Sequence, residues 1–141
     1  MKLNKATIAY IILGLAAALI LTLLITYLRS RRSKGSYEER WKENQKLLAQ
    51  KKEWKEAVIN ADQMLDEVLK KRKFKGKTMG ERLVAAQHEI TSNDMVWFSH
   101  KLKNKILYEG LELTKTDVKK AMLGFWQALR DLGAFNKEKD E

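Results

Sequence analysis

The feature that most constrains the fold is an apolar run without charged residues, Ala6 to Leu28, which a basic stretch follows at once. At about 1.5 Å per residue the run would form a helix of roughly 35 Å. That length is enough to cross a hydrocarbon core of about 30 Å. The run therefore predicts a transmembrane anchor over residues 1–28, and with it a lipid bilayer as the first partner.

A cleaved signal peptide is the alternative interpretation of this run. Lys2 and Lys5 precede it, and Ala16-Ala17-Ala18 offers the small residues that a signal peptidase accepts. The apolar core of a signal peptide is usually about 7–15 residues long, whereas here uncharged residues continue to Leu28. The length favours a retained anchor.

Basic residues on the two sides of the run predict its orientation. Four of them follow the run within the stretch Arg29–Lys34, against two before it. The positive-inside rule then places the C-terminal part in the cytoplasm and makes the protein a single-pass protein of the inner membrane. Gly14 and Ala18 have the small-x-x-x-small spacing that lets two spans approach closely, although alanine-rich spans contain this pattern by chance.

The remaining 113 residues keep all 18 acidic residues and all but two of the 28 basic ones, so their net charge is +8. Such a surface suits an anionic neighbour, which could be a membrane, RNA or an acidic protein, or it is a plain solvated surface. The chain has no cysteine, which excludes disulfides and a thiolate nucleophile. With only two histidines, we expect no metal site and no cofactor.

Proline is absent from the chain, which favours continuous helices and an all-α fold. Residues 29–51 read as a basic hinge (Ser30–Ser36) followed by a juxtamembrane stalk helix, because that stretch has few apolar residues. Residues 37–74 could form one helix or two. Residues 52–135 predict a small antiparallel four-helix bundle, and residues 136–141 form a charged tail.

The four bundle helices are expected over residues 54–69, 79–89, 94–109 and 115–132, from apolar residues at helical spacing. Thr78 and Glu81 have the spacing of a capping box at the start of the second helix. Gly110 and Gly133 stand where the third and fourth helices should end.

The third bundle helix carries the most suggestive polar residues. His100, Asn104 and Tyr108 are four residues apart, so they share one helix face, and Trp97 lies on that face too. These side chains could form a site. They could equally form an interhelical edge whose hydrogen bonds only determine packing.

The same segment resembles the signature of the HEPN superfamily, small helical bundles with an Arg-Asn-x-x-x-His motif late in a helix. The aligned residues are Lys103, Asn104 and Tyr108, followed by Glu109. Three upstream segments and one downstream segment also resemble helical domains of single-pass bacterial membrane proteins: Trp54–Ala57, Asp62–Leu69, Gly76–Leu83 and Ala128–Gly133.

The resemblance implies a ribonuclease whose His assists the ribose 2′-hydroxyl and whose Arg binds phosphate, and it implies pairing of two motif helices in a homodimer. This chain departs from the pattern at both reactive positions. Tyr108 is a poor base at neutral pH, and Lys103 lacks the bidentate fork of arginine. We therefore expect a non-catalytic interaction module whose binding or dimer surface is His100, Lys103, Asn104 and Tyr108. A ribonuclease with an atypical Lys/Tyr site, or with His100 as the base, is the alternative.

A second candidate site is a basic cluster with one aromatic residue, Phe74. It could bind phosphates of nucleic acid or anionic lipid, with Phe74 stacking or inserting. It could equally be a solvated helix end whose cations oppose the negative end of the helix dipole, with Phe74 as a hydrophobic cap. The basic cluster consists of Lys70, Lys71, Arg72, Lys73, Lys75 and Lys77.

Overall fold

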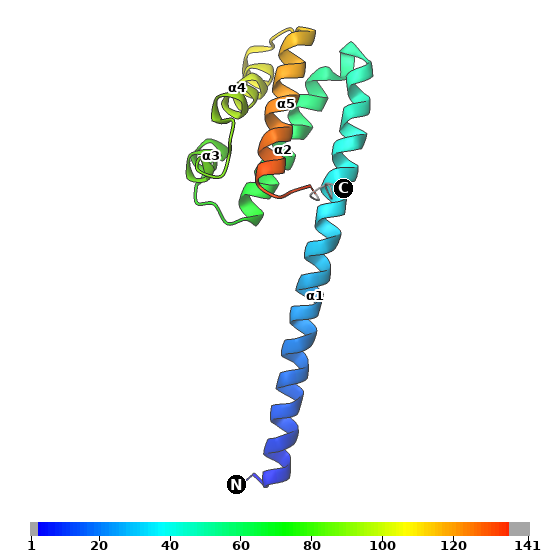
Figure 1. Ribbon diagram of the computed structural model, residues 1–141, viewed down its shortest axis with the longest axis vertical. Coiled ribbons are helices and arrows are strands. Elements are labelled where there is room, and N and C mark those ends of the chain that lie inside the picture. The colour runs from blue at the N-terminus through cyan, green and yellow to red at the C-terminus, as the bar shows by residue number, and fades with distance from the viewer. Residues whose placement is uncertain (1–2, 136–141) are drawn as a thin grey trace, which may run out of the picture. The chain divides into compact units, whose positions relative to one another are not determined.

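The computed structural model describes residues 3–135, and of residues 30–35 only the backbone. Every regular element in that range is helical, which confirms the all-α prediction (Figure 1). The chain divides into two compact units, Met1–Lys34 and Gly35–Glu141. In chain order the elements are α1 (Lys5–Lys46), the 3-10 turns η1 (Leu47–Ala49) and η2 (Lys51–Glu53), α2 (Trp54–Lys71), α3 (Met79–Ala86), α4 (Asn93–Glu109) and α5 (Lys115–Asp131).

The first unit contains the helical segment Lys5–Arg29, which is long and apolar enough to cross a membrane, with a mean hydropathy of 2.8. All its side chains are exposed in the isolated chain. Its two threonine hydroxyls bond back to the helix: Thr22 donates to the carbonyl of Ala18 and Thr26 to that of Leu23. These bonds satisfy the hydroxyls within the helix, as a hydrocarbon environment requires.

The predicted hinge at Ser30–Ser36 is not a break in secondary structure. The backbone there is helical, and α1 continues to Lys46. A single glycine and a few serines cost a helix about 1 kcal/mol or less each, and no proline interrupts the segment.

The last turns of α1 belong to the core of the second unit, where the sequence predicted a stalk. Tyr37, Trp41 and Asn44 are buried, with Trp41 only 5% exposed. The Trp41 and Phe135 rings lie 6.0 Å apart, and Asn44 Nδ2 donates to the carbonyl of Ala57 at 2.8 Å. Spacings of four and three residues put these three side chains on one helix face. That face is therefore buried although the segment has few apolar residues.

Residues 37–74 form two helices rather than one. η1 and η2 separate α1 from α2, and between them Gln50 adopts an extended conformation with φ −122°. Trp54 Nε1 donates to the carbonyl of Leu48 at 3.0 Å, which ties the start of α2 to the turn.

The predicted capping box and the predicted glycine helix ends are present, whereas the N-cap residue of α4, Ser92, makes no side-chain capping bond. Thr78 and Glu81 form the complete capping box of α3. Thr114 accepts from the backbone N–H of Asp117 at the start of α5. Gly110 and Gly133 have positive φ angles of 62° and 75° after α4 and α5. α3 ends at Ala86, earlier than the sequence predicts.

Helix α2 contacts α3, α4 and α5, and α5 also packs along α4 (Figure 1). α4 and α5 approach each other closely at Gly124, where an added Cβ would lie 2.6 Å from the carbonyl oxygen of Met95. Fully buried side chains fill the space between these helices, among them Val58, Leu65, Leu69, Leu83, Val96, Phe125 and Leu129.

Candidate functional site

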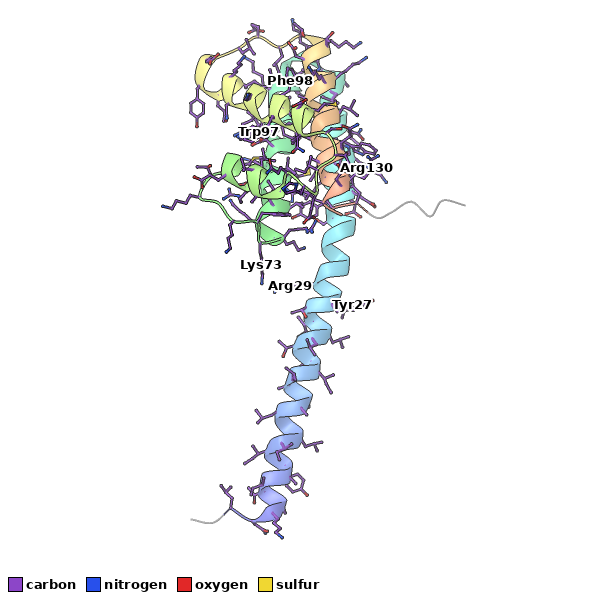
Figure 2. The ribbon with its side chains drawn as sticks, turned by 60° about the vertical axis from the view of Figure 1, so that its left-hand side comes forward. Tyr27, Arg29, Lys73, Trp97, Phe98 and Arg130 are labelled. Atoms are coloured by element: carbon purple, nitrogen blue, oxygen red, sulfur yellow. The ribbon has the colours of Figure 1, made fainter. Side chains whose placement is uncertain are left out.

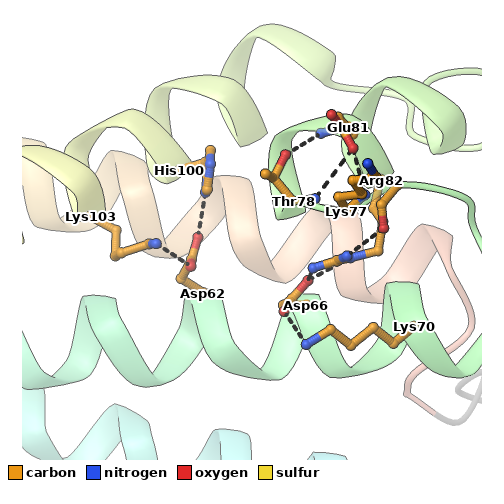
Figure 3. Close-up of polar contacts among 10 residues, drawn as sticks. Asp62, Asp66, Lys70, Lys77, Thr78, Glu81, Arg82, His100 and Lys103 are labelled. Atoms are coloured by element: carbon orange, nitrogen blue, oxygen red, sulfur yellow. Dashed lines mark hydrogen bonds and ion pairs between the residues drawn. The ribbon is translucent and has the colours of Figure 1, made fainter.

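A buried carboxylate, Asp62 of α2, is the centre of the polar contacts between α2 and α4 (Figure 3). Its Oδ1 lies 2.9 Å from His100 Nδ1, and its Oδ2 lies 3.0 Å from Lys103 Nζ. The three side chains are 5%, 10% and 16% exposed. A charge at this depth is tolerated because each carboxylate oxygen has its own donor.

Helix geometry explains why both donors reach one carboxylate. His100 and Lys103 are three residues apart on α4, so they lie on the same face one turn from each other. Asp62 follows the buried Ala61 and precedes the buried Leu65 on α2, which turns its side chain inward. The interaction joins two helices across 38 residues of sequence.

His100 is enclosed on its other side as well. Its Nε2 lies 3.5 Å from Asn104 Nδ2, and the Trp97 ring meets the imidazole edge to face at a centroid distance of 6.0 Å. A tautomer with the proton on Nδ1 donates to Asp62 and leaves Nε2 to accept from the Asn104 amide. The ring is therefore held at both nitrogens.

Three of the four predicted site residues are brought together: His100, Lys103 and Asn104. Tyr108 is not, because its side chain is 83% exposed in the last turn of α4. Asp62, the residue that organises the contacts, was missed as a site residue. The sequence does contain an indication of its role, because Asp62 is an acidic residue at a position of α2 where the helical spacing of apolar residues predicts a buried side chain.

The polar groups around Asp62 are engaged with one another. A general base needs a nitrogen within hydrogen-bond reach of a substrate, and here Asn104 faces Nε2 of a nearly buried His100. The Lys103 ammonium neutralises Asp62 instead of pointing to a free phosphate position. Within residues 3–135 no group of three His, Cys, Asp or Glu side chains could hold a metal ion.

A second polar centre lies one turn further along α2, at Asp66. Its Oδ1 accepts from Nε and Nη2 of Arg82, and its Oδ2 lies 2.9 Å from Lys70 Nζ (Figure 3). Burial raises the pKa of Asp66, and the hydrogen bonds from Lys70 and Arg82 lower it. The two hydrogen bonds together outweigh the effect of burial, so the pKa of Asp66 falls below its usual range. Arg82 also donates to the carbonyl of Gly76 at 2.8 Å, which anchors the loop between α2 and α3.

Half of the basic cluster is engaged within the protein. Lys70 pairs with Asp66, and the Lys71 ammonium lies 5.9 Å from the centre of the Tyr37 ring. Arg72 pairs with Glu89 at 2.6 Å and donates to the carbonyl of Leu132 at 3.2 Å. These contacts support the interpretation of this part of the cluster as a structural helix end.

The other half of the basic cluster, Lys73, Lys75 and Lys77, is exposed, and none of these ammonium groups forms an ion pair with the residues that the structure describes. Phe74 is half-buried against the core, with the Arg72 guanidinium 5.3 Å from its ring centre. Its backbone N–H bonds to the carbonyl of Leu69, so it acts as the hydrophobic cap of α2.

The chain matches no protein-family model, no curated protein and no solved structure. The resemblance to the HEPN superfamily therefore depends on the sequence segments named above, and it enters below as part of a proposal.

Proposed function

We propose that this protein is a single-pass inner-membrane protein whose cytoplasmic part is a HEPN-like, non-catalytic, antiparallel four-helix bundle that pairs with a second copy. The apolar helix Lys5–Arg29 supports the anchor. The basic residues that follow it support the orientation. Nothing in this proposal requires a bound cofactor.

The observation that carries the pairing is the exposure of large apolar side chains at the end of α4. Leu107 is 51% and Tyr108 83% exposed, on a helix whose inner face is well buried. Aromatic side chains such as tyrosine are enriched at protein interfaces. Tyr108 also occupies the position where the HEPN resemblance implies contact between paired motif helices.

A second copy is the partner that membrane anchoring favours. Two chains held in one bilayer meet at a much higher effective concentration than two free domains, so a modest contact area is sufficient. Within the span, Gly14 and Ala18 have the small-x-x-x-small spacing that would let two helices approach closely.

The non-catalytic part of the proposal is supported by the contacts of the motif residues. Lys103 is paired with Asp62, and Tyr108 lies apart from His100 at the solvent-exposed end of α4. In this arrangement the lysine and the tyrosine do not converge on one scissile bond. The side chains of Lys103 and Tyr108 are therefore better suited to a contact surface than to proton transfer.

Disulfide cross-linking tests the pairing, since the natural chain has no cysteine. Tyr108→Cys in native membranes should give an oxidised dimer. Glu56→Cys, an exposed position on α2, is the matched control and should remain monomeric. Equal cross-linking at both positions, or none at position 108, would contradict the proposal.

A nuclease assay tests the proposal that the domain is non-catalytic. The full chain in detergent should leave labelled single-stranded RNA intact. Cleavage that disappears in both His100→Ala and Lys103→Met would overturn the non-catalytic proposal and establish the ribonuclease alternative.

A further inference from the structure

We propose that the loop between α2 and α3 binds anionic phospholipid headgroups through Lys73, Lys75 and Lys77. This inference rests on the proposed membrane anchoring of Lys5–Arg29, but it does not depend on pairing. It assigns the chain a second contact with the bilayer, made by the folded domain.

The first argument is the division of the basic cluster. Lys70 and Arg72 are neutralised by Asp66 and Glu89. The three loop lysines at alternate positions have no such partner among residues 3–135 and are exposed. Figure 2 shows the Lys73 side chain extending away from the helices. The unpaired charge of the cluster is therefore concentrated on one short loop.

The second argument is that the loop backbone is held in place. Arg82 donates to the carbonyl of Gly76, and Glu81 accepts from the backbone N–H of Lys77 (Figure 3). Gly76 packs so closely that a Cβ there would lie 2.7 Å from the backbone nitrogen of Arg82. A loop already ordered in this way loses little conformational entropy when it binds a ligand.

The third argument is the conformation of Lys73. α2 and α5 end with the same backbone hydrogen bond, from Phe74 N to Leu69 O after α2 and from Ala134 N to Leu129 O after α5. The left-handed residue of this motif is Gly133 after α5, with φ 75°, but Lys73 after α2, with φ 61°. Glycine adopts this conformation without the steric cost that a side chain incurs. The chain thus carries a lysine where glycine would be more stable.

A lipid surface fits these observations better than a nucleic acid. A single-stranded nucleic acid is usually bound by basic residues together with a free aromatic face for stacking. The Phe74 ring is packed against the core and covered by Arg72, so the loop offers charge without a stacking surface. The candidate span ends at Arg29 and the second unit begins at Gly35, which keeps headgroups within reach of the domain.

Amine modification of the full chain in nanodiscs tests the inference. Discs of phosphatidylcholine alone are compared with discs that also contain phosphatidylglycerol, and labelling of each lysine by an N-hydroxysuccinimide ester is quantified by mass spectrometry. Lys51 and Lys52 are internal controls, because they are exposed in η2, before the start of α2, and α2 itself is about 27 Å long by helix rise.

We expect phosphatidylglycerol to slow the labelling of Lys73, Lys75 and Lys77 severalfold and to leave Lys51 and Lys52 unchanged. The protection should disappear at high salt. Equal labelling in the two discs, or equal protection of all five lysines, would overturn the inference. Protection in neutral discs by inorganic phosphate or by an oligonucleotide would assign the loop to that ligand instead. Failure of the chain to enter discs at all would count against the proposed anchor.

Lys73→Gly separates binding from folding. It should weaken the affinity of the loop for phosphatidylglycerol about fivefold, the usual effect of one basic residue near an anionic surface, and so reduce the protection of Lys75 and Lys77. At the same time the domain should unfold at a higher temperature, so misfolding cannot explain the loss. Lys51→Gln removes one charge elsewhere and should keep the protection. Full protection in Lys73→Gly would overturn the role of this residue.

Discussion

Arg82 holds Asp66 through two nitrogen atoms, with Nε and Nη2 lying 2.9 and 2.7 Å from the same carboxylate oxygen. This contact joins α3 to α2. Because Arg82 also bonds to the carbonyl of Gly76, the same guanidinium orders the loop that carries Lys73, Lys75 and Lys77. The stability of the domain and the conformation of that loop are therefore linked through one side chain.

The lowered pKa of Asp66 predicts a pH dependence of stability. The folded pKa lies below the unfolded value of about 3.9, so the unfolded chain binds the proton more readily. The stabilisation is complete above the unfolded pKa and is lost as the pH falls through the folded pKa. Unfolding in urea between pH 6 and 3, followed by tryptophan fluorescence, should show a smaller acid loss for Asp66→Asn than for the natural chain.

The control for this experiment is Glu109→Gln, which removes an exposed carboxyl group at the end of α4. It should keep the acid sensitivity of the natural chain. All four tryptophans lie in the second unit, so their fluorescence reports on that unit rather than on the span.

Removal of the buried carboxylate should be far more costly than removal of an exposed one on the same helix. Asp62→Ala leaves His100 and Lys103 without their anion in the interior, and we expect a loss of about 3–5 kcal/mol of unfolding free energy. Glu67→Ala breaks a surface pair with Arg40 whose side chains are 47% and 43% exposed, and should cost about 1 kcal/mol or less. Similar losses in urea unfolding would contradict the structural role of Asp62.

Gly124 should tolerate no side chain. A Cβ there would collide with Ser99 Oγ and with the carbonyl of Met95, and the second contact is to backbone, which cannot move aside. Gly124→Ala should destabilise the domain by about 1–3 kcal/mol or more. Gly80→Ala is the control: its Cβ would lie 3.6 Å from the nearest atom, in Trp97, and the gain in helix propensity should make it neutral or stabilising.

The ends of α2 and α5 share one backbone motif, so opposite substitutions at the two ends should change the free energy of unfolding in opposite directions. Lys73→Gly relieves a left-handed lysine and should raise the unfolding free energy by about 1 kcal/mol, whereas Gly133→Ala introduces the same strain and should lower it by a similar amount. Thermal unfolding of the two variants, measured side by side, checks this. Shifts of the same sign would contradict it.

Trp41→Ala tests whether the end of α1 is part of the domain. Its ring is buried and lies beside Phe135, so truncation should cost about 3–5 kcal/mol. Lys42→Ala changes an exposed neighbour on the same turn and should fall within about 0.5 kcal/mol of the natural chain. A Trp41→Ala domain as stable as the Lys42→Ala domain would mean that α1 contributes nothing to this core.

The features that the sequence predicted correctly are local ones. The apolar run from Ala6 to Leu28, the capping box of Thr78 and Glu81, and the helix ends at Gly110 and Gly133 depend on residues within a few positions of each other. Helical spacing and the absence of proline were enough for the all-α class. The predicted hinge, Ser30–Ser36, has a helical backbone and contains the boundary between the two compact units.

The tertiary structure decided which polar residues meet. Nothing near Asp62 in the sequence indicates that its partners lie on α4, and nothing near Trp41 indicates Phe135. Within the basic cluster, only the positions of Asp66 and Glu89 show which cations are neutralised and leave Lys73, Lys75 and Lys77 exposed. The physical reason is that propensity and capping act over one helical turn, whereas burial and ion pairing depend on elements brought together from distant parts of the chain. The sequence by itself determined an apolar helix and a set of helical segments, and the fold determined their contacts.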